Sequence, residues 1–346
     1  MDDKNLECPE DQEENKLFIQ KTESLVKPRD VITISFFSDL NRLLPKRVQR
    51  AFMKGGQKKV PYMGFIVDPY CFFLAFKITD TAAAQAMLPD GFELVETSIF
   101  KGDEKIPMAI AGVFNARTSA FMGLRFEYYI IARNKASGLM SWIICELETN
   151  SNNYNSRNGF YGFTCDPAVF TVTPFRELLI DIRNPKTGKQ FIISADINKG
   201  MTTELDEPLW IDGNLSIDYG GELKGDSSDF FSLIFDKNMM KNAVKIPLDQ
   251  VKIKANTYMS KIIDPMKPVN AIIFPFSQHF IIKQDMKKGD MTGQRDLCRH
   301  VKTFLEKADL RTMKGDDIKK PLFASLCISM VINISIVVFL LVQLYG

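Results

Sequence analysis

The sequence predicts an α+β fold, a single domain dominated by a mostly antiparallel, barrel-like sheet and followed by a C-terminal transmembrane helix. Short segments rich in β-branched and aromatic residues recur between residues 60 and 285, among them YCFFLAFKI, FEYYIIARN and QFIISADI. Turn-forming stretches such as NKASG and NPKTGK separate them. The last run, LFASLCISMVINISIVVFLLVQLY, is 24 residues long and carries no charge, whereas about 20 apolar residues are enough to cross a bilayer.

The composition is that of an ordinary globular chain. It has 346 residues, of which 45% are hydrophobic and 25% charged, and its formal net charge is +2. This length allows one large domain with appendages. The small net charge argues against a general polyanion binder, and the sequence has no Gly-rich phosphate loop. We therefore expect no nucleic-acid partner, no nucleotide and no other cofactor.

The cysteines and histidines show no metal-binding spacing. The six cysteines are Cys8, Cys71, Cys145, Cys165, Cys298 and Cys327, and the two histidines are His279 and His300. None forms a CxxC or a similar cluster, so we expect no metal site. The first residues, MDDKNLECPEDQEENK, lack the apolar core of a signal peptide. We therefore expect the soluble part to lie in the cytoplasm, with reduced thiols.

The first 59 residues divide by charge. Residues 1–30 are acidic and polar, and this composition predicts a disordered tail. Residues 31–59 are predicted to form a basic amphipathic segment, which holds seven Lys or Arg and no acid between positions 42 and 59. Such a segment can lie on an anionic membrane surface. It can equally be a solvated helix that covers the main domain.

Two segments follow the predicted β-rich domain of residues 60–285. Residues 286–320 are predicted to form a charged juxtamembrane helix, and residues 321–345 a transmembrane tail anchor. Lys319 and Lys320 stand directly before the apolar run, as is usual on the cytoplasmic side of a span. We expect a single-pass tail-anchored protein with its soluble domain in the cytoplasm. The alternative is a helix buried in the core of the domain.

Three motifs carry a resemblance to a known family. LPDGFEL (88–94) follows a helix predicted over TDTAAAQAMLP, with Asp80 or Thr81 as its cap and Pro89 as its stop. MGLRFEYYIIA (122–132) and NYNSRNGFYGFTCDP (153–167) complete the set. Together they resemble the acetoacetate decarboxylase family over residues 60–285. The resemblance implies that family's barrel-like fold, and a cavity suited to a small ligand is reasonable in such a barrel.

The resemblance also shows a departure from the family. The family's segment reads Gly-Phe-Pro-Lys-Lys and includes a lysine that forms a Schiff base with a ketone. Here Gly162 and Phe163 match the Gly-Phe pair, and Phe163 is expected to contact the ligand. Thr164, Cys165 and Asp166 stand where Pro-Lys-Lys is expected. Because a cysteine forms no iminium, we expect no Schiff-base catalysis.

Cys165 itself leaves three interpretations open. It can be a small, inert buried side chain, as free cysteines often are. It can be a reactive thiol that runs different chemistry, with His279 approaching it in space. Or the alignment is shifted, and another lysine such as Lys135 or Lys224 enters the cavity. The neighbouring Asp166 disfavours a thiolate and so favours the inert interpretation.

Glu127 and Arg157 are the candidate residues of a ligand site. If Phe126 and Tyr128 face one side of their strand, Glu127 faces the other, and a carboxylate inside a small barrel is costly unless it is paired. The resemblance implies an arginine on the neighbouring segment, and Arg157 can bind a carboxylate through two hydrogen bonds. The alternative is a structural Glu–Arg pair between two strands, with Glu148 as a rival partner for Arg157.

Two functions from different classes follow from these residues. The first is a membrane-anchored binding protein that holds a small carboxylic, oxo-acid or lipid-derived ligand without Schiff-base catalysis. The second is a divergent enzyme of the decarboxylase, hydratase or aldolase type, with Glu127 as acid or base, Arg157 as carboxylate clamp and Cys165 as a remote nucleophile candidate. A barrel packed solid with side chains would instead indicate a scaffold. An oligomer is compatible with each of them.

Overall fold

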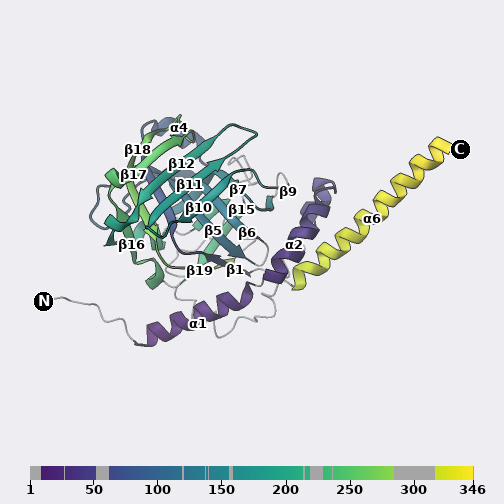
Figure 1. The fold of residues 1–346 in the computed structure, drawn as a ribbon, viewed down its shortest axis with the longest axis horizontal. Coiled ribbons are helices and arrows are strands. Elements are labelled where there is room, and N and C mark those ends of the chain that lie inside the picture. Colours follow the sequence, from purple (N-terminus) through teal and green to yellow (C-terminus); the bar gives the residue numbers. More distant parts are fainter. Residues whose placement is uncertain are drawn as a thin grey trace.

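A computed structural model of the chain describes residues 9–26, 28–51, 62–118, 121–136, 138, 140–155, 159–212, 215–218, 229–235, 237–283 and 316–345. A β-rich domain forms its centre, and the helices α2 and α6 lie to one side of it (Figure 1). Arg157 and Lys224 fall outside the described residues, as does most of the predicted juxtamembrane helix.

Seven strands of the largest sheet close into a ring. Their order is β5–β1–β19–β15–β14–β7–β6, and β6 pairs back onto β5. Only the pairing of β14 with β7 is parallel among these. The ring consists of β1 (Tyr62–Val67), β5 (Ile106–Thr118), β6 (Met122–Asn134), β7 (Met140–Thr149), β14 (Leu215–Asp218), β15 (Asp229–Ile234) and β19 (Gln278–Lys283). This arrangement confirms the predicted mostly antiparallel, barrel-like sheet.

The remaining strands extend the ring and cover one face of it. The large sheet continues from β5 through β2 (Cys71–Ile78), β18 (Ile263–Phe274), β16 (Asn242–Ile246) and β13 (Met201–Glu204), while β3 (Phe92–Leu94) pairs with β6 and β4 (Glu96–Thr97) with β5. A second antiparallel sheet contains β10 (Ala168–Val172), β11 (Glu177–Arg183), β12 (Gln190–Asp196) and β17 (Val251–Asn256). β8 (Asn153–Asn155) and β9 (Gly159–Tyr161) pair with each other.

Short helices connect the strands. The helix α4 (Thr81–Met87) begins after Asp80, whose carboxylate accepts a 2.9 Å hydrogen bond from the Ala83 backbone N–H, so the predicted cap is confirmed. Single helical turns occupy η1 (Ile197–Lys199), η2 (Pro208–Asp212), η3 (Lys237–Met240) and η4 (Leu248–Gln250).

Alternation along the strands separates two hydrophobic cores. On β6, Phe126 and Tyr128 are buried in the core shared with the four-stranded sheet, whereas Tyr129 is buried inside the ring. On β2, Phe72 and Phe73 divide in the same way. Because successive side chains of a strand point to opposite faces, these strands form a wall between the two cores. The same alternation places Phe126 and Tyr128 on one face of β6 and Glu127 on the other, as predicted.

The described part of the predicted disordered tail, from residue 9 on, is helical. The N-terminal segment forms the helices α1 (Pro9–Leu25) and α2 (Pro28–Asn41), and α1 packs against β1 and β19. The side chains of Phe18, Thr22 and Leu25 are buried. They recur at i, i+4 and i+7, so a narrow stripe packs on the domain although the rest of the helix is polar. Gly64 of β1 permits the close approach, because a Cβ there would lie 3.1 Å from the Leu25 Cβ.

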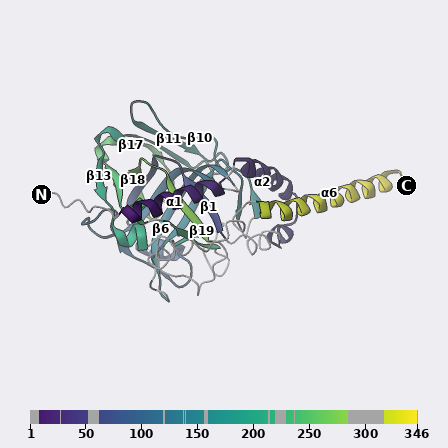
Figure 2. The same cartoon turned by 90° about the horizontal axis from the view of Figure 1, so that it is seen from below.

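The C-terminal helix α6 (Asp316–Tyr345) projects away from the domain (Figures 1 and 2). Its stretch Leu326–Leu344 is long and apolar enough to cross a membrane, and only 6% of the window with this hydropathy is buried. The helix therefore does not form the buried core element that was the alternative. α6 contacts the rest of the described chain mainly through α2.

Candidate functional site

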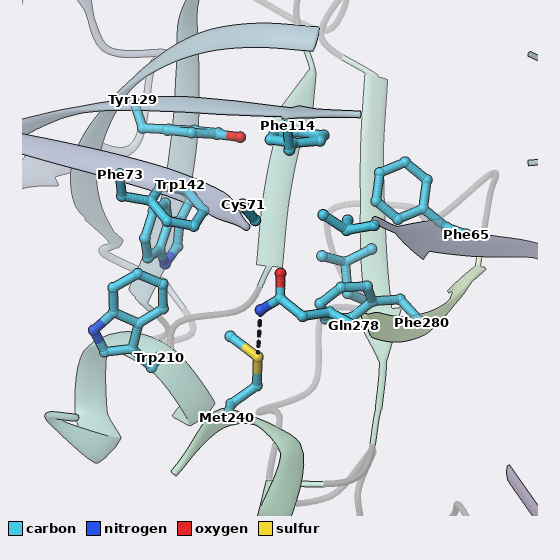
Figure 3. A pocket seen from close by; sticks show the side chains of 12 residues that line it. Phe65, Cys71, Phe73, Phe114, Tyr129, Trp142, Trp210, Met240, Gln278 and Phe280 are labelled. Carbon is cyan, nitrogen blue, oxygen red and sulfur yellow. Dashed lines mark hydrogen bonds between the residues drawn. The ribbon is translucent and has the colours of Figure 1, made fainter. Parts of the chain in front are cut away.

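A cavity of about 80 Å³ lies inside the ring of strands (Figure 3). Its walls are mainly aromatic, and they consist of Phe65, Phe73, Phe114, Phe280, Trp142 and Trp210, with Val67, Leu233 and Met240. Three further lining residues carry polar side-chain groups, namely Cys71, Tyr129 and Gln278. The side chains therefore leave a small space between them, and its surface is mainly apolar.

Close packing of aromatic rings shapes the wall of the cavity. The ring of Phe73 meets Trp142, Trp210 and Phe274 edge to face, with centroid distances of 6.0, 5.3 and 5.9 Å. Each indole N–H is already used, because Trp142 donates to the Leu209 carbonyl and Trp210 to the Ile99 carbonyl. The tryptophans thus present apolar surface to the cavity.

Gly112 of β5 makes room for this packing. A Cβ at Gly112 would lie 2.7 Å from a carbon of the Phe73 ring and 3.1 Å from one of the Tyr129 ring. Any larger residue would push one of these two lining rings into the cavity. The glycine is therefore part of what sets the cavity's volume.

Glu127 lies at the wall of the cavity in a network of buried partners. Arg125 donates from Nε to Glu127 Oε1 at 2.5 Å, and the Tyr129 hydroxyl donates to Glu127 Oε2. Both members of the ion pair are buried, with side-chain exposures of 9% for Arg125 and 6% for Glu127. Because the carboxylate is already satisfied on both oxygens, the structure places it as a charge behind Tyr129, one layer away from the cavity surface.

The charge of Glu127 acts on two groups that line the cavity. Burial raises the pKa of the Tyr129 hydroxyl well above its usual value, and the neighbouring Glu127 carboxylate adds to this. Burial likewise raises the pKa of the Cys71 thiol, and Glu127 contributes in the same direction. Both groups therefore stay protonated and neutral near pH 7. The cavity surface offers hydrogen-bonding groups without a charge of its own.

Cys165 lies on the other side of the wall, in the core shared with the four-stranded sheet. It is 2% exposed, and burial raises the pKa of its thiol to about 12, with the charges of Glu148 and Asp166 adding to the shift. Glu148 is buried too, and it accepts hydrogen bonds from Asn184 Nδ2 at 2.9 Å and from the Tyr258 hydroxyl at 3.1 Å. These contacts support the interpretation of Cys165 as an inert buried side chain.

Three of the other residues considered in the sequence analysis lie away from the cavity, and a fourth is not described. Phe163 is 62% exposed on the surface and does not line it. Lys135 is exposed in the turn after β6. His279 points away from Cys165, because its Nε2 lies 2.9 Å from Glu23 Oε1 on α1. Arg157, the predicted carboxylate clamp, lies outside the described residues, so its role stays a prediction.

The partner that Glu127 does have is Arg125, which the sequence interpretation missed. A signal was present in the segment RFEYY, where Arg125, Glu127 and Tyr129 occupy alternate positions and so share one face of the strand. Cys71 carried no comparable signal, because its position near the same cluster depends on the pairing of both β2 and β6 with β5. Among the described residues, no three His, Cys, Asp or Glu side chains group closely enough to hold a metal ion.

Comparisons with known proteins concern the fold. No protein-family model matches the chain, and no curated protein matches it by sequence. Among solved structures, an acetoacetate decarboxylase from Legionella pneumophila is similar, at 12% identity and a TM-score of 0.41, over 64% of this chain and 84% of that one. An acetoacetate decarboxylase-like enzyme from Sphingomonas wittichii is similar at 9% identity and a TM-score of 0.37, over 65% and 92%. The enduracididine biosynthesis enzyme MppR is similar at 9% identity and a TM-score of 0.40, over 67% and 89%.

The solved structures that are similar to this chain thus include members of the family that the sequence motifs resemble. At such identities and TM-scores they carry no information about what this chain binds or which reaction it performs.

Proposed function

We propose that this chain is a membrane-anchored binding protein of the acetoacetate decarboxylase-like fold, and that its cavity holds a small neutral ligand without Schiff-base catalysis. The observation that carries the proposal is the aromatic cavity beside the buried Glu127. The ligand is either a small oxo compound or the apolar end of a lipid-derived molecule.

Charge favours a neutral ligand over a carboxylate. Glu127 lies directly behind Tyr129, and its cationic partner among the described residues, Arg125, is already paired with it. A ligand carboxylate in the cavity would face this negative charge at low dielectric, and it would lose its hydration. A ketone or an alkyl chain suffers neither cost. The Gln278 side-chain amide and the Cys71 thiol can donate hydrogen bonds to a neutral oxygen. The hydroxyl hydrogen of Tyr129 is already donated to Glu127.

Size limits the ligand as well. The cavity of about 80 Å³ is smaller than the cavity of about 150 Å³ that holds benzene in a well-known engineered protein. A molecule smaller than benzene therefore suits it, as does one end of a longer chain. The proposed anchor, Leu326–Leu344, would keep the domain close to a source of such apolar molecules.

The two tryptophans provide a direct test, because both residues of this type in the chain line the cavity. The full chain is purified in a mild detergent and titrated with 2-butanone or with propanoate, which have the same number of non-hydrogen atoms. We expect a saturable change in tryptophan emission with the ketone and none with the carboxylate at equal concentration.

A pair of leucine variants controls for effects outside the cavity. Leu233→Phe fills the space and should weaken the ketone response at least tenfold. Leu248→Phe adds the same atoms at the half-exposed turn η4 and should leave it unchanged. A ketone response that is linear, or equal in the two variants, would show that the cavity is not the binding site.

A second measurement addresses the missing Schiff base. The full chain is incubated with acetoacetate, with and without borohydride, and its intact mass is measured. We expect no borohydride-dependent adduct, because a cysteine stands where the family motif has a lysine. An adduct would identify a lysine that forms an iminium and would move the divergent-enzyme hypothesis ahead of the binding hypothesis.

A further inference from the structure

We infer that the chain has a second membrane contact, a basic patch that binds the surface of an anionic lipid bilayer next to α6. The basic patch consists of the exposed side chains of Arg42, Leu43, Lys46, Arg47, Arg50 and Phe163. The inference rests on the proposed anchoring by α6, and its function would be to hold the barrel against the bilayer in one orientation.

The composition of the patch is that of an interfacial surface. Leu43 is 72% exposed and Phe163 62% exposed, which is unusual for large apolar side chains without a partner surface. Arg42, Lys46, Arg47 and Arg50 are exposed in the same segment as Leu43, and between positions 42 and 59 the sequence has seven Lys or Arg and no acid. Apolar side chains that enter the headgroup region, bordered by cations that meet lipid phosphates, are typical of peripheral membrane contacts.

The patch is held firmly on the domain. Gln49 accepts a 2.7 Å hydrogen bond from the Phe160 backbone N–H and donates a 2.8 Å bond to the Leu44 carbonyl. Asp39 accepts from Asn152 at 3.0 Å and pairs with Arg42 at 3.2 Å.

The hairpin β8–β9 therefore lies against the segment that follows α2. A Cβ at Gly162 would come within 3.1 Å of the Arg42 guanidinium, so the residue before Phe163 contacts the first cation of the patch. The basic patch is thus one surface made of two segments that are more than one hundred residues apart in the sequence.

The position of the patch matches that of the proposed span. α2 packs against α6, and both views place α2 on the side of the domain from which α6 projects (Figures 1 and 2). The exposed Ile32 and Phe36 extend the apolar surface along α2 toward α6. A bilayer that surrounds Leu326–Leu344 would therefore lie close to α2 and to the patch that follows it.

An anionic bilayer fits this surface better than a soluble polyanion does. Leu43 and Phe163 have no role in binding phosphates in solution, whereas in an interface they are removed from water. The short distance to α6 also raises the effective concentration of the lipid surface at the patch, since the two are joined in one chain.

The test uses the full chain in lipid nanodiscs of phosphatidylcholine alone or with about one-third phosphatidylglycerol. Hydrogen exchange is measured for peptides that cover residues 42–51 and 159–165. We expect exchange to slow several-fold in the anionic discs relative to the neutral ones, and this protection to fall in high salt.

Two charge-matched variants isolate the patch. Lys46→Gln, Arg47→Gln and Arg50→Gln together should abolish the protection. Lys252→Gln, Lys254→Gln and Lys261→Gln remove the same charge from β17 and the turn after it, far from α6 in Figure 1, and should retain it. All six side chains are exposed, so neither variant is expected to affect folding.

The outcomes separate this inference from the anchoring proposal. Equal exchange in neutral and anionic discs, or equal loss of protection in both variants, overturns the basic patch. Protection by a soluble polyanion such as heparin, without protection by anionic discs, overturns it as well. Carbonate extraction from anionic vesicles tests the anchor separately. If carbonate extracts the chain, α6 does not anchor it. Salt-dependent binding to the same vesicles without carbonate would then show that the patch still binds lipid.

Discussion

Arg125 and Glu127 lie two residues apart on β6 and share one face of it, joined by a 2.5 Å hydrogen bond from Nε to Oε1. The pair is buried, and the Tyr129 hydroxyl occupies the second carboxylate oxygen. Glu127 therefore shapes the charge of the cavity wall while its own oxygens are occupied. This relationship governs the first prediction.

Glu127→Gln should destabilise the domain by about 3–5 kcal/mol, because it leaves the Arg125 guanidinium buried without an opposite charge. The free energy of unfolding is measured by urea titration of the full chain in detergent, followed by circular dichroism. Arg125→Met combined with Glu127→Leu removes both charges and should cost less than Glu127→Gln alone. The single variants Arg125→Met and Glu127→Leu complete the comparison. If the loss of unfolding free energy in the double variant equals the sum of the losses in these two, the residues are not energetically coupled.

The Cys165 thiol should resist alkylation in the folded protein. Its pKa is raised to about 12 by burial, with Glu148 and Asp166 adding to the shift, whereas a free thiol has a pKa of about 8.5. The thiolate fraction at pH 8 is then roughly 10³-fold lower than in the unfolded chain. Iodoacetamide labelling followed by peptide mass spectrometry, with and without urea, measures the ratio. Equal labelling in both states would restore the reactive-thiol interpretation of Cys165.

Stability should fall at alkaline pH. Burial raises the pKa of the thiols of Cys71 and Cys145 and of the hydroxyls of Tyr128, Tyr129 and Tyr258. A raised pKa means that the folded state retains a proton that the unfolded state has lost. Stability is therefore full below the unfolded-state pKa, about 8.5 for Cys and about 10 for Tyr, and it falls as the pH rises above those values.

Each such group contributes a slope of about 1.4 kcal/mol per pH unit. The free energy of unfolding is measured from about pH 8 to pH 11, and Cys145→Val should give a shallower slope than the natural chain. A free energy that is independent of pH over this range would contradict the burial of these groups.

Gly159→Ala should loosen the segment that carries the basic patch. Gly159 has a φ of 72°, and a Cβ there would lie 2.2 Å from Gln49 Oε1, so the Gln49 side chain would have to move. Gly188 has the same φ with no atom within 4 Å of its Cβ position, so Gly188→Ala serves as a matched control for backbone strain.

The rate of trypsin cleavage after Lys46, Arg47 and Arg50 measures the effect. We expect cleavage to rise several-fold in Gly159→Ala and to stay near the natural rate in Gly188→Ala. Equal rates in both variants would mean that Gln49 does not hold the segment on the hairpin.

Predictions from the sequence were correct where they depended on local patterns, such as the alternation of side chains along a strand or the capping of a helix. Alternation placed Phe126 and Tyr128 opposite Glu127, and local capping chemistry placed Asp80 at the start of α4. The α1 helix was missed because its average composition is polar and acidic. The three buried side chains Phe18, Thr22 and Leu25 are nevertheless enough to pack it on the domain. A cavity was expected from the barrel, but its lining could not be predicted, since Cys71, Trp210 and Gln278 come from segments far apart in the sequence.

The wall formed by β2, β5 and β6 also constrains how this protein can change over time. A deletion of one residue in β6 would exchange its two faces, so that the Glu127 carboxylate would enter the aromatic core and a phenyl ring would face the cavity. In that core the carboxylate would be buried without Arg125 and Tyr129 as partners, which is costly. These strands can therefore vary by substitution while their lengths stay fixed, and length variation is expected in the turns between them.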